Sequence, residues 1–144
     1  MNTPHRLSTP SPGLVAAFGR LLIAVLFFLG ASGLLAAPHA TIAAIRSTGL
    51  PFAQLGFVIA LVVEIAGGIL LIVGYRTRLV GFALAVFTIV AGLMFHSNFA
   101  DQTQLIDFMK NVAIAGGLLQ LTAFGGGALS LDARRRTRRE ASAH

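Results

Sequence analysis

The sequence contains no cysteine and no tryptophan, and charged side chains make up only 11% of it. The lack of cysteine excludes disulfides, thiolate metal sites and cysteine nucleophiles from this chain. Soluble domains carry about 25% charged residues, whereas 56% of these 144 residues are hydrophobic. The composition therefore indicates a membrane protein, because too little polar surface is present for a soluble domain of this size.

Four apolar segments are each long enough to cross a bilayer as a helix, since a helix rises about 1.5 Å per residue through a core of about 30 Å. We expect a transmembrane domain at residues 14–127, with a flexible tail (1–13) before it and a basic tail (128–144) after it. The first apolar segment is too long for a signal-peptide core and contains Arg20, so we expect no cleavage. The four helices are expected at about 14–37, 51–74, 79–98 and 105–124.

The connections between these helices are short. A short interfacial helix is expected at 41–45, and Pro51 suits the first turn of the second transmembrane helix. Residues 125–127 are three glycines that follow the fourth helix, so we interpret them as a helix C-cap and exit from the bundle.

Basic residues concentrate on one side of the expected topology. Arg6, Arg76, Arg78 and five arginines in 134–139 all fall on the side that holds both termini. The positive-inside rule therefore places both termini in the cytoplasm. We interpret the final basic run as a tail beside anionic lipid rather than a nucleic-acid contact. The predicted fold is an all-α integral membrane four-helix bundle, and the predicted location is the bacterial inner membrane.

Small residues recur at helical spacing on the expected helices. In lipid, helices associate through close backbone approach over such residues, helped by interhelical hydrogen bonds. The glycines expected to pack helices together are Gly67, Gly68, Gly81, Gly92 and Gly117.

One carboxylate, Glu64, lies near the middle of the second expected helix. An ionised Glu at this depth costs several kcal/mol unless it is paired, solvated or protonated. Judged by depth along the helices, its partner is either Arg20 from below or His96 or Lys110 from above, and the sequence leaves these alternatives open. Two kinds of explanation for Glu64 stay open. In the first, Glu64 is purely structural, either in a buried ion pair or protonated and bonded to a backbone carbonyl. In the second, Glu64 binds a ligand or handles protons.

Four further residues, His96, Asp107, Lys110 and Asn111, are expected to form a polar rim above Glu64. Such a rim suits a small polar headgroup or a quinone ring, whose carbonyls accept hydrogen bonds. Asp107 and Lys110 are three residues apart, so they can also satisfy each other. The sequence shows no Walker loop, HExxH pair, nucleophile elbow or Rossmann fingerprint. We therefore assign no catalytic residue and no metal ligand to this chain. Quinone is the one cofactor that stays a candidate for it.

Several stretches occur in an order that resembles the DoxX family of small bacterial membrane proteins. They are GRLLIAVLFFLGASGL, GLPFA, EIAGGILLIVGYRTR, FMKNVAIAGGLLQL and GGGALSLD, which together span about residues 19–132. The resemblance implies a four-helix inner-membrane protein, and some family members are described as subunits of membrane oxidoreductases, including quinone-linked oxidation of sulfur compounds. Many family sequences carry a Lys just after the first helix, where this chain has residues 33–36, GLLA. If that Lys contributes to a headgroup site, the site is altered here or Arg46 takes its place.

Three functions are compatible with these observations. The first is a membrane subunit of an oxidoreductase complex that binds quinone while a partner subunit carries the redox cofactor. The second is a non-catalytic scaffold or assembly factor, alone or as a homo-oligomer. The third is a small proton-coupled carrier, for which four spans leave little room for alternating access in a monomer.

Overall fold

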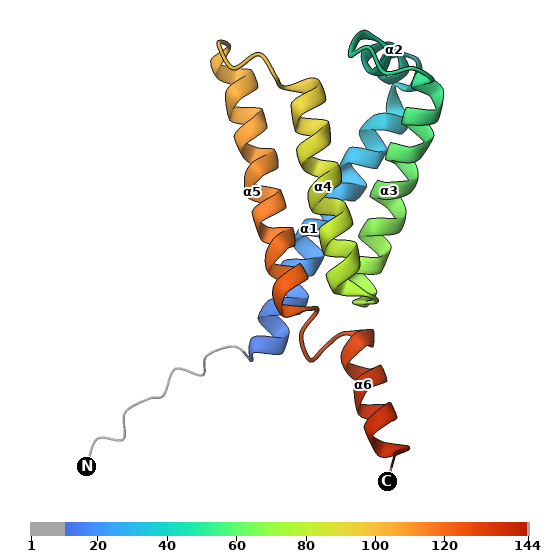
Figure 1. The fold of residues 1–144 in the computed structure, drawn as a ribbon, viewed down its shortest axis with the longest axis vertical. Helices are drawn as coiled ribbons and strands as arrows, with labels where there is room; N and C mark the ends of the chain where they lie inside the picture. The colour runs from blue at the N-terminus through green and yellow to red at the C-terminus, as the bar shows by residue number, and fades with distance from the viewer. Residues whose placement is uncertain (1–10, 144) are drawn as a thin grey trace, which may run out of the picture.

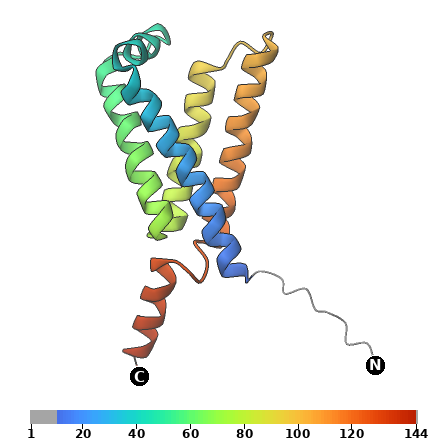
Figure 2. The same ribbon diagram turned by 180° about the vertical axis from the view of Figure 1, so that it is seen from behind.

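A computed structural model describes residues 11–143 of the chain. Most of the tail expected at residues 1–13 thus lies outside the described residues. The described part is helical and contains no strand, which confirms the predicted all-α class. Its six helices are α1 (Pro12–Ala36), α2 (Pro38–Ser47), α3 (Ala53–Val73), α4 (Thr77–Phe95), α5 (Gln102–Phe124) and α6 (Leu131–Ala141) (Figures 1 and 2).

Among the described helices, α1, α3 and α4 are long and apolar enough to cross a membrane. The fourth long helix, α5, has 23 residues, but its first turns carry Gln102, Thr103, Gln104, Asp107, Lys110 and Asn111. It runs beside α4 (Figure 1). Its role as a fourth span stays a prediction.

Several helix ends differ from the sequence-based expectation, and local backbone geometry explains the differences. Helix α3 begins at Ala53 because Phe52 adopts a left-handed conformation with φ 60° and forms the turn from α2. Pro51 therefore precedes the helix instead of lying in its first turn. Helix α5 begins three residues before the expected start, because the Asp101 side chain accepts hydrogen bonds from the backbone N–H of Thr103 (2.8 Å) and Gln104 (3.3 Å).

One further helix is longer than expected, and another was not expected at all. The interfacial helix expected at 41–45 extends over the whole of α2. The basic tail contains α6, whose first turn is capped by the Ser130 hydroxyl, which accepts from the N–H of Ala133 at 3.2 Å. The basic segment is therefore ordered as a helix with its own N-cap.

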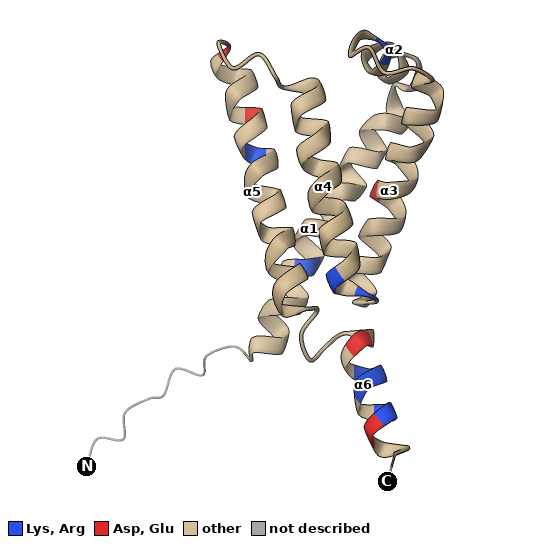
Figure 3. Ribbon diagram, viewed as in Figure 1, with Lys and Arg blue, Asp and Glu red and all other residues tan. Residues whose placement is uncertain are grey.

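The long helices pack as two pairs, α1 with α3 and α4 with α5, and the pairs diverge toward the end that carries α2 (Figures 1 and 2). The start of α1 and helix α6 lie at the opposite end, where most Lys and Arg residues gather (Figure 3). The buried core lies mostly in the half of the bundle nearer α6. It consists of Ala24, Phe27, Leu71, Val80, Leu84, Ala85, Ala115 and Leu118.

Four of the five glycines expected to pack helices lie at close contacts with neighbouring helices. A Cβ added at any of four expected packing glycines would lie between 2.6 and 3.1 Å from a neighbouring atom, closer than ordinary contact; they are Gly67, Gly68, Gly81 and Gly92. At Gly67 this atom is Cδ2 of Leu84, a core residue. At Gly117 the nearest atom would be 3.7 Å away, an ordinary van der Waals distance. Close packing thus depends on the absence of a side chain at the first four positions.

Candidate functional site

Glu64 lies at a cavity of about 250 Å³ whose wall is formed by α1, α3, α4 and α5. The cavity is placed roughly half-way along α3, on the side of the bundle core that faces away from α6. Most of its lining is apolar, including Phe27 and Phe87. Three polar side chains contribute to it: Glu64 from α3, Thr88 from α4 and Asn111 from α5. The site therefore combines an apolar wall with a few convergent polar groups, which is typical of small-molecule sites.

Two polar atoms at this cavity are buried without a hydrogen-bond partner among residues 11–143: Oε2 of Glu64 and Oγ1 of Thr88. The carboxyl group packs against α1 at Gly30, where an added Cβ would lie 2.9 Å from Oε1. Buried polar groups are nearly always hydrogen-bonded, because leaving one unpaired costs free energy. The carboxyl of Glu64 and the hydroxyl of Thr88 thus both have unused hydrogen-bonding capacity at the same cavity.

Arg20 does not pair with Glu64. Its guanidinium is buried, and Nη1 donates to the Leu71 carbonyl oxygen (3.2 Å) while Nη2 donates to that of Leu129 (2.6 Å). These bonds join α1 to the end of α3 and to the loop that precedes α6. Arg20 is thus fixed at the α6 end of the bundle, and the alternative in which it approaches Glu64 from below is not realised.

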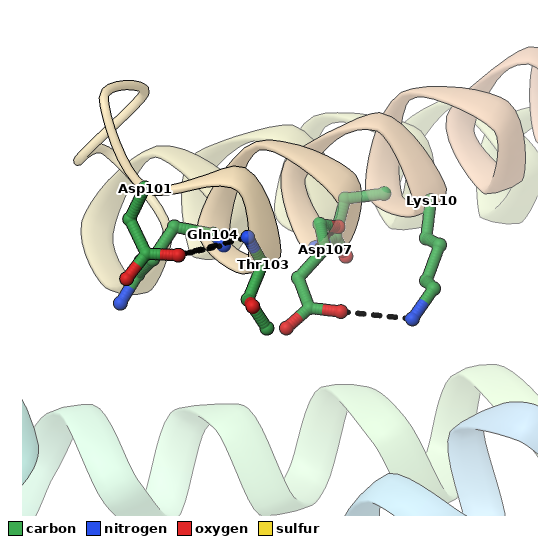
Figure 4. A network of polar contacts seen from close by, with 6 residues as sticks. Asp101, Thr103, Gln104, Asp107 and Lys110 are labelled. Carbon is green, nitrogen blue, oxygen red and sulfur yellow. Dashed lines mark hydrogen bonds and ion pairs between the residues drawn. The ribbon is translucent and has the colours of Figure 1, made fainter.

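The expected polar rim is only partly brought to the cavity. Asp107 and Lys110 pair with each other on α5, with 2.9 Å between Oδ1 and Nζ (Figure 4). His96 is the C-cap of α4. None of these three residues lines the Glu64 cavity, whereas Asn111 does and also donates from Nδ2 to the Asp107 carbonyl oxygen (3.0 Å). Of the rim residues, the structure places only Asn111 beside Glu64.

Sequence reasoning did not assign Thr88 and Gly30 to the site. Thr88 lies among small buried residues of α4, including Gly81 and Gly92, and small residues at helical spacing favour helix packing. Gly30 has no polar atom in a side chain, so only its contact with Glu64 reveals its role. Among residues 11–143, no group of three or more His, Asp or Glu side chains is placed to hold a metal ion.

A second set of polar contacts joins α6 to the start of α4. The Asp132 carboxylate accepts hydrogen bonds from the backbone N–H of Arg76 (2.8 Å) and from the N–H and hydroxyl of Thr77 (2.8 and 2.9 Å). The Asp132 N–H donates to the Gly74 carbonyl oxygen (3.0 Å). Burial raises the pKa of Asp132, but the hydrogen bonds from Thr77 and Arg76 outweigh it, so that this pKa lies below its ordinary value. Asp132 therefore acts as the N-cap that α4 lacks within its own sequence.

The family model for DoxX matches residues 15–97, which is more than half of the chain. The chain belongs to the DoxX family. It is 36% identical to inner membrane protein YqjF of Escherichia coli (strain K12) over 115 residues, which covers 78% of this chain and 85% of the relative. It is 32% identical to inner membrane protein YphA of the same organism over 131 residues, which covers 84% of this chain and 88% of the relative. No solved structure matches it significantly.

These matches agree with the membrane-spanning helices of the structure. This DoxX protein is an integral protein of the bacterial inner membrane, in contact with the lipid bilayer. The matched residues include the helices that supply Glu64, Thr88 and Gly30 to the cavity and end before α5, which supplies Asn111.

Proposed function

We propose that this DoxX protein is a membrane subunit of an oxidoreductase complex, that its Glu64 cavity binds the ring of a membrane quinone, and that a partner subunit carries the redox cofactor. The observation that supports the proposal is the pair of unpartnered buried oxygens, Glu64 Oε2 and Thr88 Oγ1, at one intramembrane cavity. A ligand with hydrogen-bonding groups on opposite sides of a flat apolar ring would satisfy both.

The chemistry of the lining suits a quinone headgroup. A quinone carbonyl accepts hydrogen bonds, and the Thr88 hydroxyl, a protonated Glu64 and the second N–H of Asn111 Nδ2 are donors. The rings of Phe27 and Phe87 supply apolar walls. Pockets for drug-sized ligands are about 300–1,000 Å³. The observed volume of about 250 Å³ is smaller, so it suits a single headgroup ring whose tail remains in lipid.

The proposal is tested by extracting the full-length protein from its own membranes in mild detergent and measuring retained quinone by native mass spectrometry. We expect Thr88→Val and Glu64→Leu each to weaken quinone binding by roughly tenfold, since a hydrogen bond contributes about 0.5–1.5 kcal/mol. The matched control is Thr122→Val, which removes a hydroxyl that bonds the Leu118 carbonyl oxygen (3.1 Å) away from the cavity. Equal quinone retention in Thr88→Val and Thr122→Val would contradict the site.

Stability measurements separate a ligand site from a packing role. Without ligand, Thr88 Oγ1 is an unpaired buried group, so Thr88→Val should leave the ligand-free protein as stable as before or more stable. If the polar residues instead lock the helices, the same substitution should lower the unfolding temperature. For a ligand site, Thr88→Val should thus weaken quinone binding without lowering the stability of the ligand-free protein.

One observation favours the second candidate, a non-catalytic scaffold. Both Nη atoms of Arg20 bond carbonyl oxygens of the chain, and Asp107 pairs with Lys110, as residues that fix helix packing do, although the buried Nε of Arg20 has no partner among residues 11–143. If no quinone or cofactor-bearing subunit is retained and phospholipid alone accompanies the protein, the scaffold becomes the better assignment.

A further inference from the structure

A separate cleft of about 680 Å³ lies at the α6 end of the bundle, far from the Glu64 cavity. Its wall is formed by the start of α4, the glycine loop 125–127 and the first turns of α6. Arg76, Arg78 and Arg136 line it, and the exposed apolar side chains of Leu79 and Phe124 flank it. Since α4 begins and α5 ends here, the cleft lies where the membrane-embedded part of the bundle meets the aqueous phase.

The arginines of this cleft keep their charge available. Asp132 is the acidic residue that lines it, and both of its carboxylate oxygens already accept hydrogen bonds from Arg76 and Thr77. In the described part of the chain, the ion pair between Asp107 and Lys110 is the single one within 4.0 Å, so no arginine there forms such a pair with a carboxylate. Arginine recognises phosphate through several parallel N–H donors and remains charged at any physiological pH.

The neighbouring arginine on α6 behaves differently. Arg135 lies over the ring of Tyr75, with 4.6 Å between its guanidinium carbon and the ring centroid, and Arg76 approaches the same ring at 5.9 Å. These contacts hold α6 against the turn between α3 and α4. Arg78 and Arg136 are thereby left on opposite walls of the cleft, one on α4 and one on α6, both exposed.

We infer that this cleft binds the phosphate group of an anionic phospholipid. The arginines contact the phosphate from below, and the acyl chains extend along the bundle past Leu79 and Phe124. This arrangement differs from a diffuse attraction between a basic tail and the membrane surface, because it requires residues of α4 and α6 together. Juxtamembrane arginines attract anionic lipid in any case, so the test must separate the cleft from the general charge.

The experiment titrates the delipidated full-length protein with phosphatidylglycerol or phosphatidylcholine in detergent and counts bound lipid by native mass spectrometry. Both lipids carry a phosphate, and only the first has a net negative charge. We expect the double variant Arg78→Gln/Arg136→Gln to weaken phosphatidylglycerol binding roughly tenfold or more, to the level of phosphatidylcholine. The control Arg134→Gln/Arg138→Gln removes the same charge from exposed positions of α6 that do not line the cleft, and should retain binding within about threefold.

The proposal that the cleft binds the lipid would be overturned by equal losses of phosphatidylglycerol binding in the two double variants. It would also be overturned if the unaltered protein showed no preference for phosphatidylglycerol. Tighter binding of inorganic phosphate than of phosphatidylglycerol to the delipidated protein would assign the arginines to a soluble phosphate ligand and overturn the lipid proposal. Circular dichroism checks that each variant stays helical. If the first double variant does not, the comparison of Arg136→Gln with Arg138→Gln tests the same point on α6 alone.

Discussion

Replacing Asp132 by alanine is expected to detach α6 from the start of α4. The substitution removes three hydrogen bonds at once, from two backbone N–H groups and one hydroxyl of Arg76 and Thr77. Loss of an N-cap costs about 0.5–2 kcal/mol, and a hydrogen bond contributes about 0.5–1.5 kcal/mol. Because water reaches the half-buried carboxylate and can replace part of these bonds, we expect a local cost of about 1.5 kcal/mol. Asp132→Asn keeps one acceptor oxygen and should cost less.

Hydrogen exchange measures this cost where it arises, at the backbone amides of Arg76 and Thr77. A local cost of about 1.5 kcal/mol corresponds to roughly tenfold faster exchange, since 1.4 kcal/mol is a factor of ten. Glu140→Ala is the matched control, because it removes an exposed acid from the same helix and changes the net charge by the same amount as Asp132→Ala. If Asp132→Ala leaves these two amides as protected as Glu140→Ala does, the cap does not hold α6.

The same contact predicts an acid-sensitive α6. The folded-state pKa of Asp132 is depressed below the unfolded value of about 3.9. Its stabilising contribution is therefore fully present above that unfolded-state value and is lost as the pH falls through the lower folded-state pKa. Exchange at Thr77 should accelerate below about pH 4 beyond the intrinsic pH effect, and Asp132→Asn should remove this extra step. An identical pH profile in the two proteins would refute the assignment.

Three other substitutions test the packing. Gly67→Ala should destabilise the bundle by about 1–3 kcal/mol, because its Cβ would overlap buried Leu84, whereas Gly116→Ala meets no atom within 4 Å and should not; thermal unfolding in detergent compares them. Arg20→Ala should cost about 3 kcal/mol, since one buried and one partly buried carbonyl group lose a charged donor; an unfolding temperature like that of the unaltered protein would contradict this role. Lys110→Gln breaks an exposed ion pair and should leave the unfolding temperature unchanged; a clear decrease would show that the pair supports the bundle.

The helices could be predicted from sequence, and Glu64 could be singled out there as a candidate site residue, because both inferences depend on local properties. Hydropathy over about 20 residues identifies a membrane helix, and the cost of a charge at mid-depth singles out a carboxylate. The helix ends were less accessible to sequence reasoning. The start of α4 is capped by Asp132, which lies 55 residues from Thr77 in the sequence, so no local pattern could indicate it.

The partner of Glu64 could not be derived from depth alone. Arg20 and Lys110 lie at depths that permit an approach to the carboxylate, but the lateral arrangement of the helices decides which contact forms. Arg20 reaches two carbonyl groups at the α6 end, and Lys110 reaches an acid on its own helix. Thr88 was missed for a related reason, since a threonine among small residues on α4 resembles a packing residue until its unpaired hydroxyl is located at the cavity.

The two ends of the bundle differ in a way that bears on how a ligand reaches Glu64. At the α6 end, the core residues, the Arg20 bonds and the Asp132 cap hold all the long helices together. Toward α2, the two helix pairs diverge (Figure 1). A molecule that enters from the α6 side would have to break several buried contacts, whereas one that enters from the bilayer or the opposite side would separate pairs that already diverge. We therefore expect the proposed ligand of Glu64 to enter from the bilayer or from the α2 end, and a lipid-soluble quinone can take the first of these routes.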